Sequence, residues 1–147
     1  MSHLVLIFSK GDDWISRLIA FFSYSRVTHV ALVRGNEVIE ASGANEPRGV
    51  RKVGLSHWMQ HHPDYEYRII KHPDPDAVWA LASARLGKSY DWSWLFRWLL
   101  RLSWRPNDYW VCSELIVVCA AEAGSPLLSA GHNTVTPRDL YMISEAA

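Results

Sequence analysis

A cysteine stands where a buried helix is expected to begin. The segment YWVCSELIVVCAAEAG, residues 109–124, has the apolar composition of a buried helix, and Gly124 followed by Pro126 ends it. Cys112 falls in the expected first turn, where unpaired backbone N–H groups and the helix dipole favour a thiolate. Because the thiolate is the nucleophilic form, Cys112 is a candidate catalytic nucleophile. The alternative is core filling, since free cysteines are usually buried and inert.

The second cysteine, Cys119, lies seven residues further along the same expected helix. That separation is about 10 Å along a helix axis, which is too long for a disulfide bond. We therefore expect two free thiols, with Cys119 as a core residue, in a reducing compartment. The N-terminal segment resembles no signal peptide, and no apolar run reaches the length of a membrane span. These observations together favour a cytoplasmic protein.

A nucleophilic cysteine needs a base, and His29 is the best candidate because it lies within an otherwise apolar strand. Gly35-Asn36 predicts a two-residue hairpin turn, which places His29 opposite Ser42 and Glu40 diagonally beside it on the same face. A carboxylate there would orient the imidazole and stabilise its charged form. The pairing also explains why a glutamate occurs in a strand that is expected to be buried.

The other six histidines have simpler interpretations as terminal or polar loop residues: His3, His57, His61, His62, His72 and His132. The spacing of His57 and His61 would suit a metal site on one helix face. No acidic residue or cysteine completes that set, so a solvated loop is the favoured interpretation. The sequence therefore predicts no metal and no cofactor.

The pattern along the chain predicts an α+β protein with one domain, residues 1–147. Strands are expected mostly in the first half, and helices mostly in the second. The expected elements are a strand at 4–8, a helix at 12–22, a hairpin at 27–42, a strand followed by a surface loop at 43–63, a strand at 65–70, and helices at 75–86, 92–104, 109–124 and 136–144.

The charge balance argues against nucleic acid as a partner. The 147 residues include 15 basic and 15 acidic side chains, without a run of like charge. A nucleic-acid-binding domain normally carries a basic patch or stripe. An apolar fraction of 49% and a charged fraction of 20% are typical of an ordinary globular protein.

Three motifs resemble those of the NlpC/P60 cysteine peptidases. HVALVRGNEVIEAS resembles their histidine hairpin, YWVCSELI their cysteine helix, and LGKSYDWSW their glycine–tyrosine–tryptophan segment. In standard members the cysteine precedes the histidine, whereas here His29 precedes Cys112. That order is similar to the circularly permuted branch, the YaeF/YiiX-like group, which is related to the lecithin:retinol acyltransferase-like enzymes. The matches cover less than half of the chain.

The resemblance implies a papain-like fold, in which an antiparallel sheet packs against the cysteine-bearing helix. It implies amide hydrolysis through an acyl-enzyme, with Cys112 as nucleophile, His29 as base and Glu40 as orienting residue. Tyr90, in the LGKSYDWSW motif, would add a hydroxyl near the nucleophile, or else is a packed aromatic residue. Two departures bear on substrate preference: Val111 replaces the usual acidic residue before the cysteine, and Glu114 replaces a glycine.

The implied substrates are peptidoglycan-type peptides or small amino-acyl amides. The acyltransferase relatives imply lipid esters or thioesters instead, and a binding module without catalysis is a third alternative. The expected helix at 92–104 bears on this choice, because it combines tryptophans with arginines at four-residue spacing. Such a helix either packs on the core or makes a peripheral contact with anionic lipid. We expect at least two of Trp94, Trp98 and Trp104 to be partly exposed.

Overall fold

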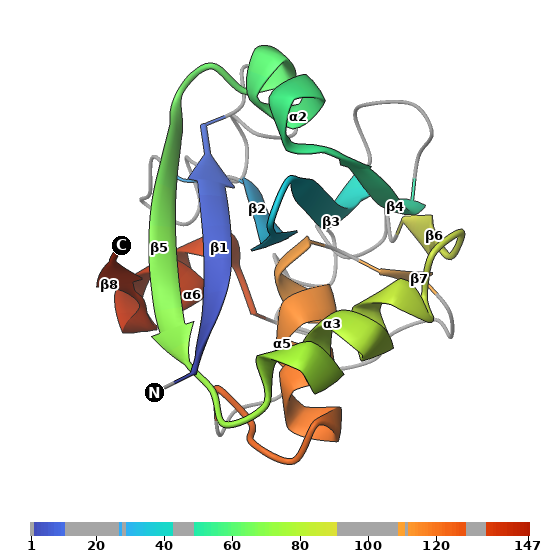
Figure 1. Cartoon of the computed structure of the whole chain (residues 1–147), viewed down its shortest axis with the longest axis vertical. Helices are drawn as coiled ribbons and strands as arrows, with labels where there is room; N and C mark the ends of the chain where they lie inside the picture. Colours follow the sequence, from blue (N-terminus) through green and yellow to red (C-terminus); the bar gives the residue numbers. More distant parts are fainter. Residues whose placement is uncertain are drawn as a thin grey trace, which may run out of the picture.

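The computed structural model describes residues 2–10, 27, 29–42, 49–90, 109–110, 112–128 and 135–147. Its main feature is a six-stranded antiparallel sheet in the order β4-β3-β2-β1-β5-β8 (Figure 1). The strands are β1 (His3–Ser9), β2 (His29–Arg34), β3 (Glu37–Ser42), β4 (Gly49–Gly54), β5 (Tyr65–Lys71) and β8 (Glu145–Ala146). A separate pair, β6 (Ser89–Tyr90) and β7 (Tyr109–Trp110), is parallel.

The central hairpin forms with the predicted turn. β2 pairs with β3 so that Arg34 lies opposite Glu37, and Gly35 takes a φ of 58°. A positive φ at this position is what a tight hairpin turn of this kind requires, and it is why glycine is favoured there. The register of the hairpin decides which face of the sheet each side chain occupies, so it also fixes the positions of the candidate site residues.

Four helices are present in the described part of the chain: α2 (Leu55–His61), α3 (Pro75–Ser83), α5 (Cys112–Glu122) and α6 (Pro137–Ile143). Asp74 caps α3 as its sequence predicts, because its carboxylate accepts a hydrogen bond from the Ala77 amide at 3.0 Å. Thr136 and Asp139 form a capping box at the start of α6. The helix expected at 109–124 begins at Cys112, because Tyr109 and Trp110 are strand residues.

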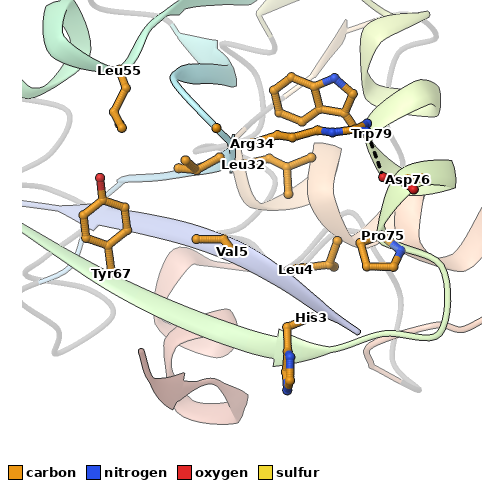
Figure 2. Close-up of a pocket in the computed structure, with 12 residues that line it drawn as sticks. His3, Leu4, Val5, Leu32, Arg34, Leu55, Tyr67, Pro75, Asp76 and Trp79 are labelled. Carbon is orange, nitrogen blue, oxygen red and sulfur yellow. Dashed lines mark ion pairs between the residues drawn. The ribbon is translucent and has the colours of Figure 1, made fainter. Parts of the chain in front are cut away.

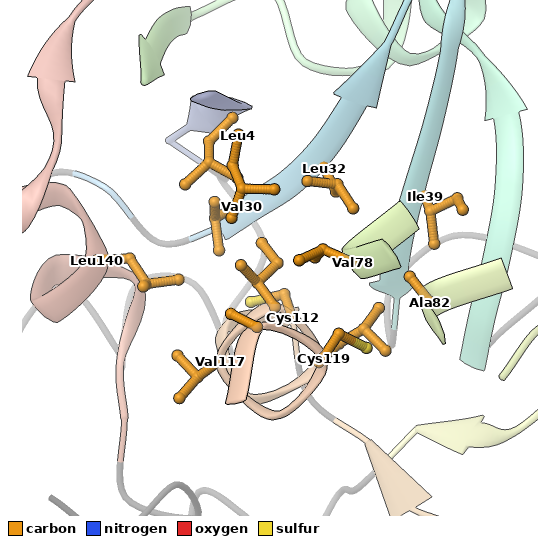
Figure 3. Close-up of a cluster of buried hydrophobic side chains, with 14 of the residues drawn as sticks. Leu4, Val30, Leu32, Ile39, Val78, Ala82, Cys112, Val117, Cys119 and Leu140 are labelled. Atoms are coloured by element: carbon orange, nitrogen blue, oxygen red, sulfur yellow. The ribbon is translucent and has the colours of Figure 1, made fainter. Parts of the chain in front are cut away.

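Both faces of the sheet are covered, which explains the continuous apolar sequence of β1. On one face, side chains from β1, β2 and β3 pack against α3, α5 and α6 in a large core that includes Cys112 and Cys119 (Figure 3). On the other face, Ile7, Ala31 and Val38 pack around Trp58 of α2. Residues Cys112 to Ala120 of α5 are all buried, as expected of a helix that is apolar nearly all round.

The prediction of a surface loop after β4 was wrong, because α2 occupies residues Leu55–His61. Histidine and glutamine gave this segment a polar character, but one residue, Trp58, is fully buried and holds the helix on the sheet. The helices expected at 12–22 and 92–104 lie outside the described residues.

Candidate active site

A buried glutamate lies at the centre of the candidate site. Glu40 of β3 is only 1% exposed. Its Oε1 accepts hydrogen bonds from Nε and Nη2 of Arg51, at 2.9 and 2.7 Å. Its Oε2 accepts a hydrogen bond from the indole N–H of Trp58 and lies 2.8 Å from Nε2 of His29. Burial of a carboxylate is costly unless charged and hydrogen-bonding partners compensate, and here three side chains do so.

The contact between His29 and Glu40 is the one that the hairpin register predicts. His29 is the first residue of β2, and the distance of 2.8 Å is that of a charge-assisted hydrogen bond. Residues of β2 and β3 that share this face, Ala31 and Val38, belong to the cluster around Trp58. The prediction of a hydrogen bond between the two side chains is confirmed.

The two side chains stabilise each other's charged forms. Burial lowers the pKa of His29, but the negative charges of Glu40 and Cys112 and hydrogen bonds to both outweigh it and raise the pKa to about 10. Burial likewise raises the pKa of Glu40, and the charges of His29 and Arg51 together with the Trp58 hydrogen bond lower it to about 2. At neutral pH the site therefore holds an imidazolium beside a carboxylate.

Cys112 of α5 also acts on His29. It is the first residue of α5 and belongs to the core that packs on the opposite face from Trp58. Its side chain acts on His29 both as a neighbouring charge and through a hydrogen bond. Since Nε2 of His29 faces Glu40, Nδ1 is the ring nitrogen left for the thiol. His29 therefore interacts with both Glu40 and Cys112.

Three contributors to this site were not identified in the sequence: Arg51, Trp58 and His62. Arg51 follows a glycine-rich stretch and gave no sign of burial, yet it is 5% exposed. Trp58 and His62 are four residues apart, which is a helical spacing that could have indicated one face of α2. Their rings stack with centroids 4.0 Å apart.

His62 was expected to be a solvated loop residue, and it instead lies against the site. Its ring stacks on that of His29 with centroids 5.5 Å apart, and its Nδ1 lies 2.9 Å from the Trp58 carbonyl oxygen, to which it donates. Burial and the positive charge of His29 lower the pKa of His62 to about 4. It is therefore neutral at physiological pH, and its Nε2 carries a lone pair.

The other histidines in the described chain lie apart from this cluster. His57 and His61 contact each other on α2, through a hydrogen bond from His61 Nδ1 to the His57 carbonyl. His72 was expected in a polar loop but is 2% exposed. Its Nδ1 accepts from the Asp74 amide and its Nε2 lies 3.2 Å from the Ala120 carbonyl, so it ties β5 to the helical core.

Cys119 is a core residue, as the sequence predicts. It is fully buried and makes no disulfide with Cys112, so both thiols are free. Burial is the main reason that the pKa of Cys119 rises to about 11. At neutral pH this thiol is protonated, which excludes it as a nucleophile under those conditions.

The segment that bears Tyr90 lies beside the strand that leads to Cys112. Tyr90 is the second residue of β6, and it pairs with Trp110 of β7. Trp110 precedes Cys112 by two residues, so the β6–β7 pairing brings the two motifs of the sequence together. The tryptophans of the expected 92–104 helix lie outside the described residues, and His132 does as well.

Clefts lie at both ends of strand β2. One, of about 530 Å³, lies at the end of the sheet that holds His29 and includes Ser9, Lys10 and Val27 in its lining. The other, of about 410 Å³, lies at the opposite end of β2, around Arg34 and Gly35, where Figure 2 shows an ion pair between Arg34 and Asp76. None of the residues Cys112, His29 and Glu40 lines either cleft; Ser9 of the first cleft lies directly opposite His29 in the β1–β2 pairing.

The fold has a known counterpart. The chain is similar to a solved structure described as "metalloprotein yiiX" from Escherichia coli O157:H7, with a TM-score of 0.63 and 23% sequence identity. The similarity covers 84% of this chain and 66% of that protein's length. No protein-family model and no curated protein matches the sequence. The chain therefore has a YiiX-like α+β fold.

None of the helices in the described residues is both long enough and apolar enough to cross a bilayer.

Proposed function

We propose that this chain is a cysteine hydrolase that cleaves amide bonds through an acyl-enzyme, with Cys112 as nucleophile, His29 as acid and base, and Glu40 as orienting residue. The observation that supports this most directly is the environment of His29: its Nε2 lies 2.8 Å from Glu40, and the charge of Cys112 and a hydrogen bond to Cys112 also raise its pKa. Nucleophile, base and orienter within hydrogen-bonding reach are the geometric signature of nucleophilic catalysis.

The raised pKa of His29 suits this chemistry. The proposed reaction starts from the Cys112 thiolate beside this imidazolium, and the thiolate attacks a carbonyl carbon. The thiolate forms the new C–S bond, and the carbonyl oxygen becomes an oxyanion. The backbone N–H of Cys112, at the start of α5, is the donor proposed to stabilise that oxyanion. His29 then gives its proton to the leaving amine as the C–N bond breaks.

The second half of the reaction reverses these roles. His29, now neutral, accepts a proton from water while the oxygen attacks the thioester carbonyl. The C–S bond breaks, the carboxylic acid leaves, and the proton returns the pair to its resting state. Throughout, Glu40 holds the ring through Nε2 and compensates the positive charge of the imidazolium. No metal or cofactor takes part in these steps.

The proposal includes a circularly permuted papain-like arrangement of NlpC/P60 type. Two features support it: the histidine precedes the cysteine in the sequence, and the fold is YiiX-like. Tyr90 is proposed to place its hydroxyl near the nucleophile, because its strand pairs with the one that leads to Cys112. Peptidoglycan-type peptides or small amino-acyl amides are the proposed substrates.

Mass-mapped alkylation with iodoacetamide tests the nucleophile. At pH 7 a thiol with a pKa of about 11 has a thiolate fraction of about 10⁻⁴, so Cys119 should label very slowly. We expect Cys112 to label at least about tenfold faster, and His29→Ala to remove most of that advantage. Preferential labelling of Cys119 would contradict the assignment. Cys112→Ala should abolish turnover and leave the folded state intact.

A lipid-directed thioesterase or acyltransferase would use the same cysteine. The feature that favours it is the tryptophan- and arginine-rich sequence of residues 92–104. Co-sedimentation with vesicles that contain anionic lipid tests this alternative, with Trp94, Trp98 and Trp104 changed to serine as the matched variant. Binding that the variant loses supports the lipid enzyme, and no binding by the unchanged protein excludes it.

A divalent metal site is the second candidate, because His29, Glu40 and His62 each place one ligand atom within 4.8 Å of the others. Two histidines and one carboxylate are a suitable donor set for transition metals, and the related structure is described as a metalloprotein. The local charges oppose it. Arg51 already neutralises Glu40, whose oxygens also accept from Trp58 and His29. Metal analysis of the purified protein separates the two functions.

A further inference from the structure

The cleft next to Ser9 combines a buried hydroxyl with two opposite charges, Lys10 and Asp64, that make no ion pair within the described residues. Ser9 lines it, is only 1% exposed, and its Oγ has no hydrogen-bond partner among the described residues. A buried hydroxyl without a partner costs free energy, so such a group is commonly kept for a ligand or an ordered water. Ser9 lies directly opposite His29 in the β1–β2 pairing. Directly opposed residues share a face, with Cβ atoms about 5 Å apart.

Two opposite charges lie next to Ser9 and do not pair with each other. Lys10 and Asp64 lie just beyond Ser9 and Tyr65, the last residue pair of the β1–β5 pairing. There the Lys10 amide donates a hydrogen bond to the Asp64 carbonyl at 3.3 Å. Both residues line the cleft, and neither takes part in an ion pair in the described part of the chain. A cation and an anion held at one rim suit a ligand that carries both charges.

The remaining lining combines aromatic and charged side chains. Phe8 and Tyr141 meet edge to face with ring centroids 5.3 Å apart, and Tyr65 is 41% exposed. Glu66 and Arg138 bring further charges to the same cleft. An acyl chain would have to desolvate Lys10 and Asp64 without pairing them, which is costly. The volume of about 530 Å³ is in the range of small-molecule sites.

We infer that this cleft binds the zwitterionic part of a short peptide or amino-acyl substrate, with its carboxylate at Lys10, its ammonium at Asp64 and a polar group at Ser9. The inference deepens the proposed function, on which it rests, because it assigns the substrate class to peptides and not to lipids. Ser9 is the specificity-determining residue closest to the catalytic histidine.

Binding to the Cys112→Ala variant tests the inference without turnover. The ¹⁵N-labelled protein is titrated with alanyl-alanine, its N-acetyl and C-amide forms, and decanoate. We expect a Kd in the millimolar range for the free dipeptide, with amide shifts at Ser9, Lys10 and Tyr65. Each cap should weaken binding by about tenfold, because it removes one charge-assisted contact.

Substitutions assign each charge. Lys10→Gln should bind the free dipeptide and its C-amide form with equal affinity. Asp64→Asn should bind the free dipeptide and its N-acetyl form with equal affinity. Lys52→Gln and Asp76→Asn change charges outside this cleft and should have no effect. Ser9→Ala should weaken binding about fivefold without loss of stability, because it removes a hydroxyl that has no described partner.

Three results would overturn the inference: tighter binding of decanoate than of the dipeptide, shifts confined to residues of the other cleft such as Trp79, or no binding up to about 50 mM dipeptide. The alkylation of Cys112 is measured separately and without substrate. If Cys112 is reactive but the cleft binds no dipeptide, the inferred substrate class is wrong and the proposed catalysis stands. If Cys112 is unreactive, the proposed catalysis is wrong, whatever the cleft binds.

Discussion

Arg51 donates to Glu40 from both Nε and Nη2, at 2.9 and 2.7 Å, and both nitrogens reach the same oxygen, Oε1. The other oxygen, Oε2, is thereby left for His29 and Trp58. Arg51 is thus part of the reason that a carboxylate with almost no exposure can remain charged beside the imidazole.

The first prediction concerns that ion pair. Arg51→Met should destabilise the fold by about 3 kcal/mol, because removing one partner of a buried pair leaves the other charge uncompensated. Lys52→Met on the same strand is the matched control. Its ion pair with Glu37 is 3.3 Å long and half-exposed, so its loss should cost less than about 1 kcal/mol. Urea unfolding of both variants measures the difference, and equal costs would contradict the role given to Arg51.

The second prediction concerns Glu40→Gln. The amide keeps most of the shape of the carboxylate but removes its charge, so the pKa of His29 should fall from about 10 towards its ordinary value. Turnover should decrease and not vanish, since the base itself remains. Histidine NMR titration and kcat are the two measurements. Glu37→Gln, on the exposed end of the same strand, should change neither. An unchanged His29 titration would show that Glu40 does not set its charge.

The third prediction separates the hydrolase from the metal site. His62→Phe keeps a ring that can stack on Trp58 but removes the only ligand atom that His62 offers. A cysteine hydrolase should retain activity within about fivefold, because His62 takes no step in the mechanism. A metal site should lose about 10- to 100-fold or more in metal affinity. Metal content and turnover are measured on the same sample, and parallel loss of both would favour the metal centre.

Much of the sheet and part of the site were predictable because their signals are local. Gly35-Asn36 fixes a turn, the turn fixes the register, and the register places His29 and Glu40 on one face. Cys112 at the start of α5 likewise follows from short-range pattern. The proximity of Cys112 to His29 is different, since it depends on how α5 packs against the sheet, and the sequence pointed to it only through the family resemblance.

The residues that were missed depend on long-range packing. Trp58 and His62 lie in a segment whose composition is that of a loop, and only its position over the sheet makes it a helix with a buried face. Arg51 stands between Val50 and Lys52 in β4, and nothing near it in the sequence indicates a buried carboxylate partner. His72 follows β5 and is buried beside α5, where its Nε2 lies 3.2 Å from the Ala120 carbonyl oxygen.

The last prediction concerns pH and stability. His29 has a folded-state pKa of about 10, above its ordinary value of 6.5, so its contribution is complete below pH 6.5 and is lost as pH rises towards 10. In that window the folded state binds one more proton than the unfolded state, and the free energy of unfolding should fall by about 1.4 kcal/mol per pH unit.

Glu40 and His62 affect the free energy of unfolding at lower pH. The Glu40 contribution is lost from pH 4.5 down to about 2, and that of neutral His62 from pH 6.5 down to about 4. Stability should therefore be greatest near pH 6.5. Urea unfolding between pH 5 and 9 checks this, with His29→Gln as the comparison, since that variant should lack the alkaline decline. A decline of equal slope in both proteins would place its origin in other groups and would contradict the imidazolium assigned to His29.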